Sequence, residues 1–267
     1  MATAMDAFID RPRASPTGDE RFFLGVAIAM TVVIVAGFST QLAMGRSTFY
    51  SPPLVHAHAL MFMGWVMIYL LQNILVTTGR LAFHRRLGWV AAGWIVPMII
   101  LGLAVTVAMV RRGSVPFFFQ PLHFLVFDPV SLIAFAGLTG SAILLRNRTE
   151  WHRRLHVCGM AMLMGPGFGR LLPMPLLAPW GWELSFACGL VFPVAGVLYD
   201  VSRTRRIHPA WHWGILAMLA AFIAIEAITY SAVGDALYRV VTVDSPGASV
   251  APLEFPPPPV GPLVTGR

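Results

Sequence analysis

The sequence predicts an all-α fold, a polytopic membrane protein whose seven transmembrane helices form one bundle. Two observations lead to this prediction. Hydrophobic residues make up 57% of the 267-residue chain and charged residues only 12%, a composition typical of membrane proteins. Apolar runs of about 20 residues, the length that crosses a bilayer as a helix, recur at residues 22–44, 54–78, 87–110, 118–145, 155–178, 182–200 and 210–232.

The arginines predict the orientation of the bundle. All 19 basic residues are arginine, and most of them lie in the N-terminal segment and in loops 77–88, 145–154 and 201–209. By the positive-inside rule these parts face the cytoplasm, so we expect a cytoplasmic segment 1–21, a membrane domain 22–232 and an extracytoplasmic Pro-rich tail 233–267. The expected location is the inner (cytoplasmic) membrane of a bacterium, with the first run kept as an anchor and the tail mobile or lying over a partner.

Composition also excludes several function classes. The net charge of +7 does not indicate nucleic-acid binding, because the arginines sit between apolar runs and form no basic patch. Without lysine the chain has no Schiff-base chemistry. Cys158 and Cys188 both fall inside apolar runs, where cysteine is usually a small core residue.

A short motif occurs twice. Residues 83–89 read FHRRLGW and residues 151–157 read WHRRLHV, so His84 matches His152 at an offset of 68. His56 matches His123 at an offset of 67. We interpret the second and third runs, and the fourth and fifth, as a duplicated helical hairpin. The arginines of the motif also have a simpler explanation as anchors at the membrane interface.

The histidines fall into two layers. His56, His58 and His123 open helices on the outer side, whereas the inner side has His84, His152, His156, His208 and His212. Two imidazoles from facing helices are what a low-spin haem b requires. His56 and His58 point to opposite sides of a helix, so only one of them would bind iron. The partner of His84 is His152 by the repeat or, one turn deeper, His156.

The stretch HAHALMFMGWVMIYLLQNILVTTGR resembles the first core helix of the cytochrome b561-like di-haem membrane proteins, through His58, Leu60-Met61, Gly64 and Arg80. The resemblance covers residues 54–178. It implies electron transfer across the membrane through an outer haem b on His58 (or His56) and His123, and an inner one on His84 and His156. Arg80, Arg153 and Arg154 would balance the inner haem propionates. A quinone or a redox protein would be the redox partner.

The chain departs from that family in two respects. It has seven apolar runs instead of six, and it lacks the lysine on the family's substrate side, so ascorbate as donor is not implied. The chain is also similar to uncharacterised bacterial multi-pass proteins with an HRxLG-like segment.

Ionisable residues inside the apolar runs suggest an alternative. Asp128, Arg170 and Glu226, with Glu183 and the outer histidines, are expected to share one outer polar cavity, which the Gly165–Gly169 run would open by breaking the fifth helix. Three histidines with Asp128 or Glu226 would suit Zn²⁺ or another divalent metal, and hence a metal-dependent hydrolase acting on lipid. A third hypothesis is an accessory subunit of a larger membrane complex, without chemistry of its own. An Asp128–Arg170 pair would then only hold helices together.

Overall fold

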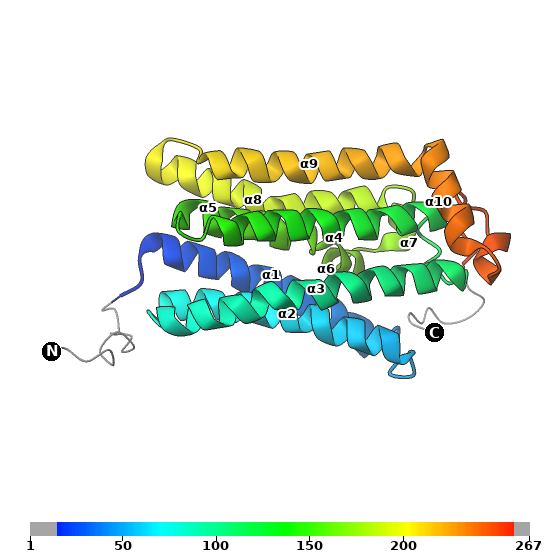
Figure 1. Cartoon of the computed structure of the whole chain (residues 1–267), viewed down its shortest axis with the longest axis horizontal. Helices are drawn as coiled ribbons and strands as arrows, with labels where there is room; N and C mark the ends of the chain where they lie inside the picture. Colours follow the sequence, from blue (N-terminus) through cyan, green and yellow to red (C-terminus); the bar gives the residue numbers. More distant parts are fainter. Residues whose placement is uncertain (1–14, 259–267) are drawn as a thin grey trace.

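The computed structural model describes residues 15–258, which form a helical bundle without β-strands in that range (Figure 1). The elements are α1 (Gly18–Ala43), α2 (Pro53–Thr77), α3 (Leu81–Arg111), α4 (Pro121–Leu144), α5 (Thr149–Met162), α6 (Gly165–Leu171), α7 (Met174–Leu177), α8 (Gly181–Thr204), α9 (Pro209–Thr229), α10 (Ala232–Thr242) and the 3₁₀ turn η2 (Pro246–Ser249).

Six of these helices, α1, α2, α3, α4, α8 and α9, are long and apolar enough to cross a membrane, when residues 15–258 are considered. They lie side by side along the long axis of the molecule (Figure 1). Their outward faces carry large apolar side chains such as Val32, Val96 and Ile223, which are 57%, 58% and 65% exposed. An apolar surface of this kind indicates that the bundle is surrounded by lipid.

The fifth predicted span, 155–178, is not one helix. The chain leaves α5 at Leu163 and continues as the short helices α6 and α7. The break comes directly before the Gly-Pro-Gly-Phe-Gly run, as expected from its content of glycine and proline. In Figure 1, α5 lies at the left end of the bundle, α6 near its middle and α7 toward its right end. The three short helices together therefore lead from one end of the bundle toward the other.

Several helices begin earlier than the apolar runs suggest. The third run was expected to start at residue 87 and the fifth at residue 155, but α3 begins at Leu81 and α5 at Thr149. Gly79, with a φ of 74°, forms the tight turn that separates α2 from α3. His84 and His152 are consequently both the fourth residue of their helices. His84 is inside α3 and not ahead of it.

Two groups of buried side chains hold the bundle together. The larger group lies between α1, α2, α3, α4, α5, α8 and α9 and includes the fully buried Met30, Phe135 and Trp211. The smaller group lies where α10 packs on α3 and α4, with Val110, Leu122 and Tyr238. We refer to the two ends of the bundle as the α5 end, where α5 begins, and the α10 end (Figure 1).

The described part of the C-terminal tail, which was expected to be mobile or to lie over a partner, is docked on the bundle. Arg111 donates from its guanidinium to the carbonyl of Val241, 2.6 Å away. The backbone N–H of Leu122 donates to the carbonyl of Pro252, at 2.8 Å. Residues 250–258, which we call the C-terminal strap, thus lie across the start of α4, where the carbonyl of Pro252 satisfies a backbone N–H of the first turn.

Candidate functional site

Three histidines meet at the α5 end. The ring centres of His84, on α3, and His152, on α5, are 6.2 Å apart, and their planes are nearly perpendicular at 88°. The ring of His156 lies one turn further along α5, 4.6 Å from that of His152. His156 is also within electrostatic range of His84. The structure therefore brings together both residues that were considered as partners of His84, and the ring in direct contact with His84 belongs to His152.

The hydrogen bonds of these rings leave nitrogen atoms free. His152 donates from Nδ1 to the carbonyl of Ala142, at 2.8 Å, so its Nε2 carries a lone pair and no proton. A backbone hydrogen bond of this kind orients a histidine that binds a metal through its other nitrogen. The Nδ1 of His84 is buried and has no hydrogen-bond partner within residues 15–258. A buried nitrogen without a partner is costly, and binding of an ion or a water molecule would offset that cost.

The arginines of the second His-Arg-Arg-Leu copy are already paired with carboxylates of the protein. Arg154 is buried and makes two hydrogen bonds to Asp200, at 2.9 and 2.6 Å. The indole of the fully buried Trp211 donates to the same carboxylate, at 2.8 Å. Arg153 contacts Asp19 at 2.5 Å, and both arginines contact Glu150. These contacts join α5 to α8, α9 and the start of α1, so the two guanidiniums are not free for haem propionates.

Arg80, the third arginine expected to balance a propionate, is different. Its side chain is exposed, and no described residue forms an ion pair or hydrogen bond with it. It lies between α2 and α3, four residues before His84.

Asp200 and Trp211 were not predicted from the sequence as site residues. The signal was present: Asp200 is an isolated acidic residue at the last position of the predicted span 182–200. A lone carboxylate at such a depth usually has a basic partner on a neighbouring helix.

The residues expected in one outer polar cavity lie in two separate places. His123 donates from Nε2 to Glu226 on α9, at 3.2 Å, and packs its ring against Trp182 of α8. Asp128 accepts a hydrogen bond from Thr106 of α3, at 3.1 Å. The separation has a geometric reason, because residues five apart on α4 point about 140° away from each other around the helix axis.

Arg170 interacts with the second of these places. It is within electrostatic range of both Asp128 and His58, although no direct ion pair forms within the described chain. Its guanidinium lies 4.0 Å from the ring centre of Phe38 on α1 and donates to the carbonyl of Pro166, at 2.9 Å. Arg170 thus helps to seat α6 against α1.

The outer histidines do not form a facing pair. His56 is exposed and donates to the carbonyl of Phe49, at 3.1 Å. His58 stacks on Phe62 of its own helix, with ring centres 4.2 Å apart. Neither ring contacts His123 within residues 15–258. In the same range no three His, Cys, Asp or Glu side chains are arranged to hold a metal ion.

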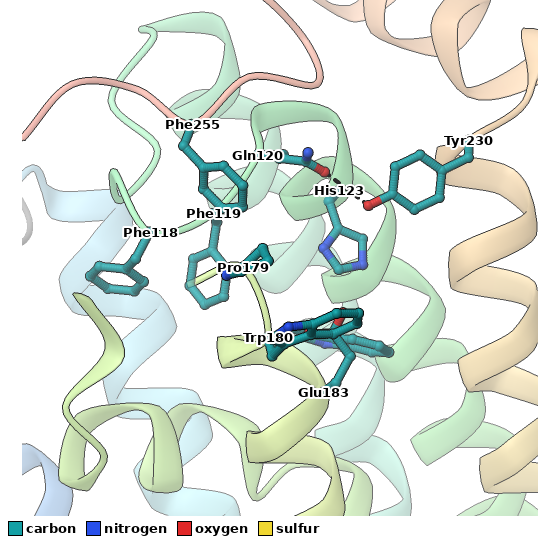
Figure 2. Close-up of a pocket in the computed structure, with 10 residues that line it drawn as sticks. Phe118, Phe119, Gln120, His123, Pro179, Trp180, Glu183, Tyr230 and Phe255 are labelled. Atoms are coloured by element: carbon teal, nitrogen blue, oxygen red, sulfur yellow. Dashed lines mark hydrogen bonds between the residues drawn. The ribbon is translucent and has the colours of Figure 1, made fainter. Parts of the chain in front are cut away.

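A pocket opens at the α10 end, between α4, α8, α9 and the C-terminal strap (Figure 2). It encloses an empty volume of about 500 Å³, part of it open to the outside. Gln120 and Tyr230 are joined across its rim by a hydrogen bond of 3.0 Å. The lining residues are Phe118, Phe119, Gln120, His123, Pro179, Trp180, Trp182, Glu183, Tyr230 and Phe255.

Comparison with known proteins gave no match to a family model, to a curated protein or to a solved structure.

Proposed function

We propose that this protein crosses the membrane seven times and carries electrons on a haem b held at the α5 end by His84 and a histidine of α5. The observation that supports this proposal is the 6.2 Å separation of the His84 and His152 ring centres. Metal–imidazole bonds of about 2 Å on opposite faces of one iron separate two ring centres by roughly 6 Å. The donor set therefore suits a bis-histidine haem.

The residues around the pair have defined tasks in this proposal. The Ala142 carbonyl holds the tautomer of His152, which leaves Nε2 free for iron. His84 has a buried Nδ1 without a hydrogen-bond partner in the described chain, and binding to iron would satisfy this atom. Of the three arginines expected to balance propionates, Arg80 is the exposed one, and propionates would pair with it, because Arg153 and Arg154 are engaged with carboxylates of the protein. The bound haem would supply one-electron redox chemistry, with a quinone or a redox protein as partner.

The alternative function, a zinc-dependent hydrolase, receives less support from the geometry. A hydrolytic zinc needs three protein ligands, and residues 15–258 contain no such group. A haem iron needs only two side-chain ligands. The second haem of the resembled family has no matching pair of facing imidazoles here, so we propose a single haem.

The α5–α7 segment supports seven crossings, because it spans the bundle from one end toward the other (Figure 1). The repeated hairpin is supported by the equivalent positions of His84 and His152, each the fourth residue of its helix. We therefore propose that α2–α3 and α4–α5 are related by duplication.

An optical spectrum of the purified protein tests the proposal. We expect reduced-minus-oxidised bands of a six-coordinate haem b and a single haem per chain. These haem bands should be absent from His84→Ala and from His152→Ala. They should be present in the control His212→Ala, which changes an exposed histidine at the same end. If His156→Ala abolishes it while His152→Ala does not, His156 is the second ligand.

A colourless protein after expression with ample haem would contradict the proposal, and stoichiometric zinc in it would favour the hydrolase. Haem that remains six-coordinate in all three histidine variants would show that it binds elsewhere.

A further inference from the structure

The pocket at the α10 end is lined by one carboxyl group, that of Glu183, and by no arginine among the described residues. Glu183 lines the pocket, and Glu226 is close enough to interact with it electrostatically. The Oε2 atom of Glu183 is buried and has no hydrogen-bond partner in the described part of the chain. His123 is the only lining residue that can carry a positive charge, and its hydrogen bond goes to Glu226. Buried carboxylate oxygens without partners are costly, and a cation would offset that cost.

Aromatic rings form the rest of the wall. Trp182 packs edge to face on His123, with ring centres 5.0 Å apart, and Trp180 is 63% exposed at the mouth. Figure 2 shows the rings of Tyr230, Phe119 and Phe255 around the same opening. Faces of Trp, Tyr and Phe attract organic cations, and a combination of such rings with carboxylates is typical of ammonium-binding sites.

The C-terminal strap supplies one side of the pocket. The carbonyl of Leu253 accepts a hydrogen bond from the side-chain amide of Gln120, at 2.7 Å, and Pro252 is held by Leu122. These two anchors fix Phe255 over the pocket, as seen in Figure 2. The strap therefore closes a site that helices alone leave open.

From these features we infer that the pocket binds an organic cation, an ammonium group with small apolar substituents, between Glu183 and the aromatic wall. The ammonium group would be carried by a free small molecule or by a lipid headgroup. This site is separate from the histidine cluster, which lies at the opposite end of the bundle (Figure 1).

Binding of choline, compared with its uncharged isostere 3,3-dimethyl-1-butanol, tests the inference. The full-length protein is placed in nanodiscs of phosphatidylglycerol, and binding is followed by saturation-transfer NMR. We expect choline to bind and the alcohol to bind at least about tenfold more weakly. Glu183→Gln should weaken choline binding by about tenfold, and Phe255→Ala should also weaken it. The matched control is Glu254→Gln, an exposed glutamate in the strap that does not line the pocket.

The source of the ammonium group is tested in nanodiscs of phosphatidylcholine. Weaker apparent binding of free choline there would show that a headgroup competes for the site, whereas unchanged binding would indicate a free molecule. Equal binding of choline and the alcohol would overturn the inference, as would no detectable choline binding or unaltered binding in Glu183→Gln.

Discussion

The two copies of His-Arg-Arg-Leu have the same letters but different surroundings. Arg85 and Arg86 are exposed at the start of α3. In the second copy Arg154 is buried against Asp200, and Arg153 pairs with Asp19. The difference arises from position in the bundle, because α5 packs between α4, α8 and α9. The histidines of the two copies nevertheless meet.

We expect Arg154→Gln to destabilise the protein strongly. It would leave the Asp200 carboxylate buried without its cation, and loss of one partner of a buried pair costs about 3–5 kcal/mol. The free energy of unfolding in detergent measures this. The matched control is Arg85→Gln in the first copy, which is exposed and should change stability by no more than about 0.5 kcal/mol. Equal effects of the two substitutions would contradict a structural role for the second copy.

His208 makes stability depend on pH. Its Nδ1 accepts a hydrogen bond from the backbone N–H of Ala210, at 3.1 Å, and so caps α9 only when the ring is neutral. Burial, and after it the nearby Arg154 guanidinium, lowers the pKa of His208. In the unfolded chain the ring takes up a proton near pH 6.5, before the folded protein does. This stabilising contribution is therefore complete above that pH and is lost as the pH falls.

The substitution His208→Asn isolates this effect, because asparagine caps helices without titrating. We expect the Tm of the wild type to fall more than that of His208→Asn between about pH 7 and about pH 5. The other histidines titrate equally in both proteins. Parallel Tm curves would rule out His208 as the source of the pH dependence.

At the residue scale the sequence predicted one contact between side chains and missed another. The repeat indicated His84 and His152, which the structure places in contact. Hydropathy alone put His84 outside its helix, because the first turn of α3 is polar enough to end an apolar run. The pairing of Arg154 with Asp200 could not be predicted, since it depends on how α5 and α8 are rotated relative to each other.

At the element scale, the broken segment α5–α7 depends on a close contact with α1. A Cβ atom added at Gly37 would lie 2.6 Å from the carbonyl oxygen of Gly167 in α6. A backbone atom cannot move aside as a flexible side chain can. The two helices therefore approach each other as closely as glycine permits, which places Arg170 beside Phe38.

Gly37→Ala should accordingly destabilise the protein by about 1–3 kcal/mol through overpacking. Gly25→Ala on the same helix is the control, since a Cβ there meets nothing within 4 Å. It should be neutral or stabilising by up to about 1 kcal/mol, because alanine favours helix. Thermal unfolding of both variants in the same detergent measures the difference. Similar behaviour of the two would show that α1 and α6 are not in tight contact.

The positions of the helices could be predicted from the sequence, and their ends less well. Six of the seven apolar runs correspond to long helices, because burial in lipid requires long apolar segments with internally paired backbones. The glycine-rich run predicted the break in the fifth. The docking of the strap on the start of α4 was not predicted, because a proline-rich sequence favours an extended backbone without indicating what that backbone will contact.

At the scale of the whole molecule, the arginines distinguish the two ends. Within residues 15–258 the α5 end has the arginines of the α2–α3, α4–α5 and α8–α9 connections, and the α10 end has Arg46, Arg111, Arg112 and Arg239. The excess at the α5 end favours a cytoplasmic location for that end and for the start of α1. With the seven crossings proposed above, α10 is expected on the opposite side of the membrane.

Single cysteines test this topology in a Cys158→Ser, Cys188→Ser background. Tyr50→Cys, 96% exposed at the α10 end, should react with a membrane-impermeant maleimide on intact cells. Asn147→Cys, exposed in the α4–α5 connection, should react only after permeabilisation. A cysteine replacing the exposed Val233 at the start of α10 decides the number of crossings. If Val233→Cys is labelled on intact cells while Asn147→Cys is protected, the α5–α7 segment must cross the membrane. If Val233→Cys is protected instead, this segment returns to the side from which it started.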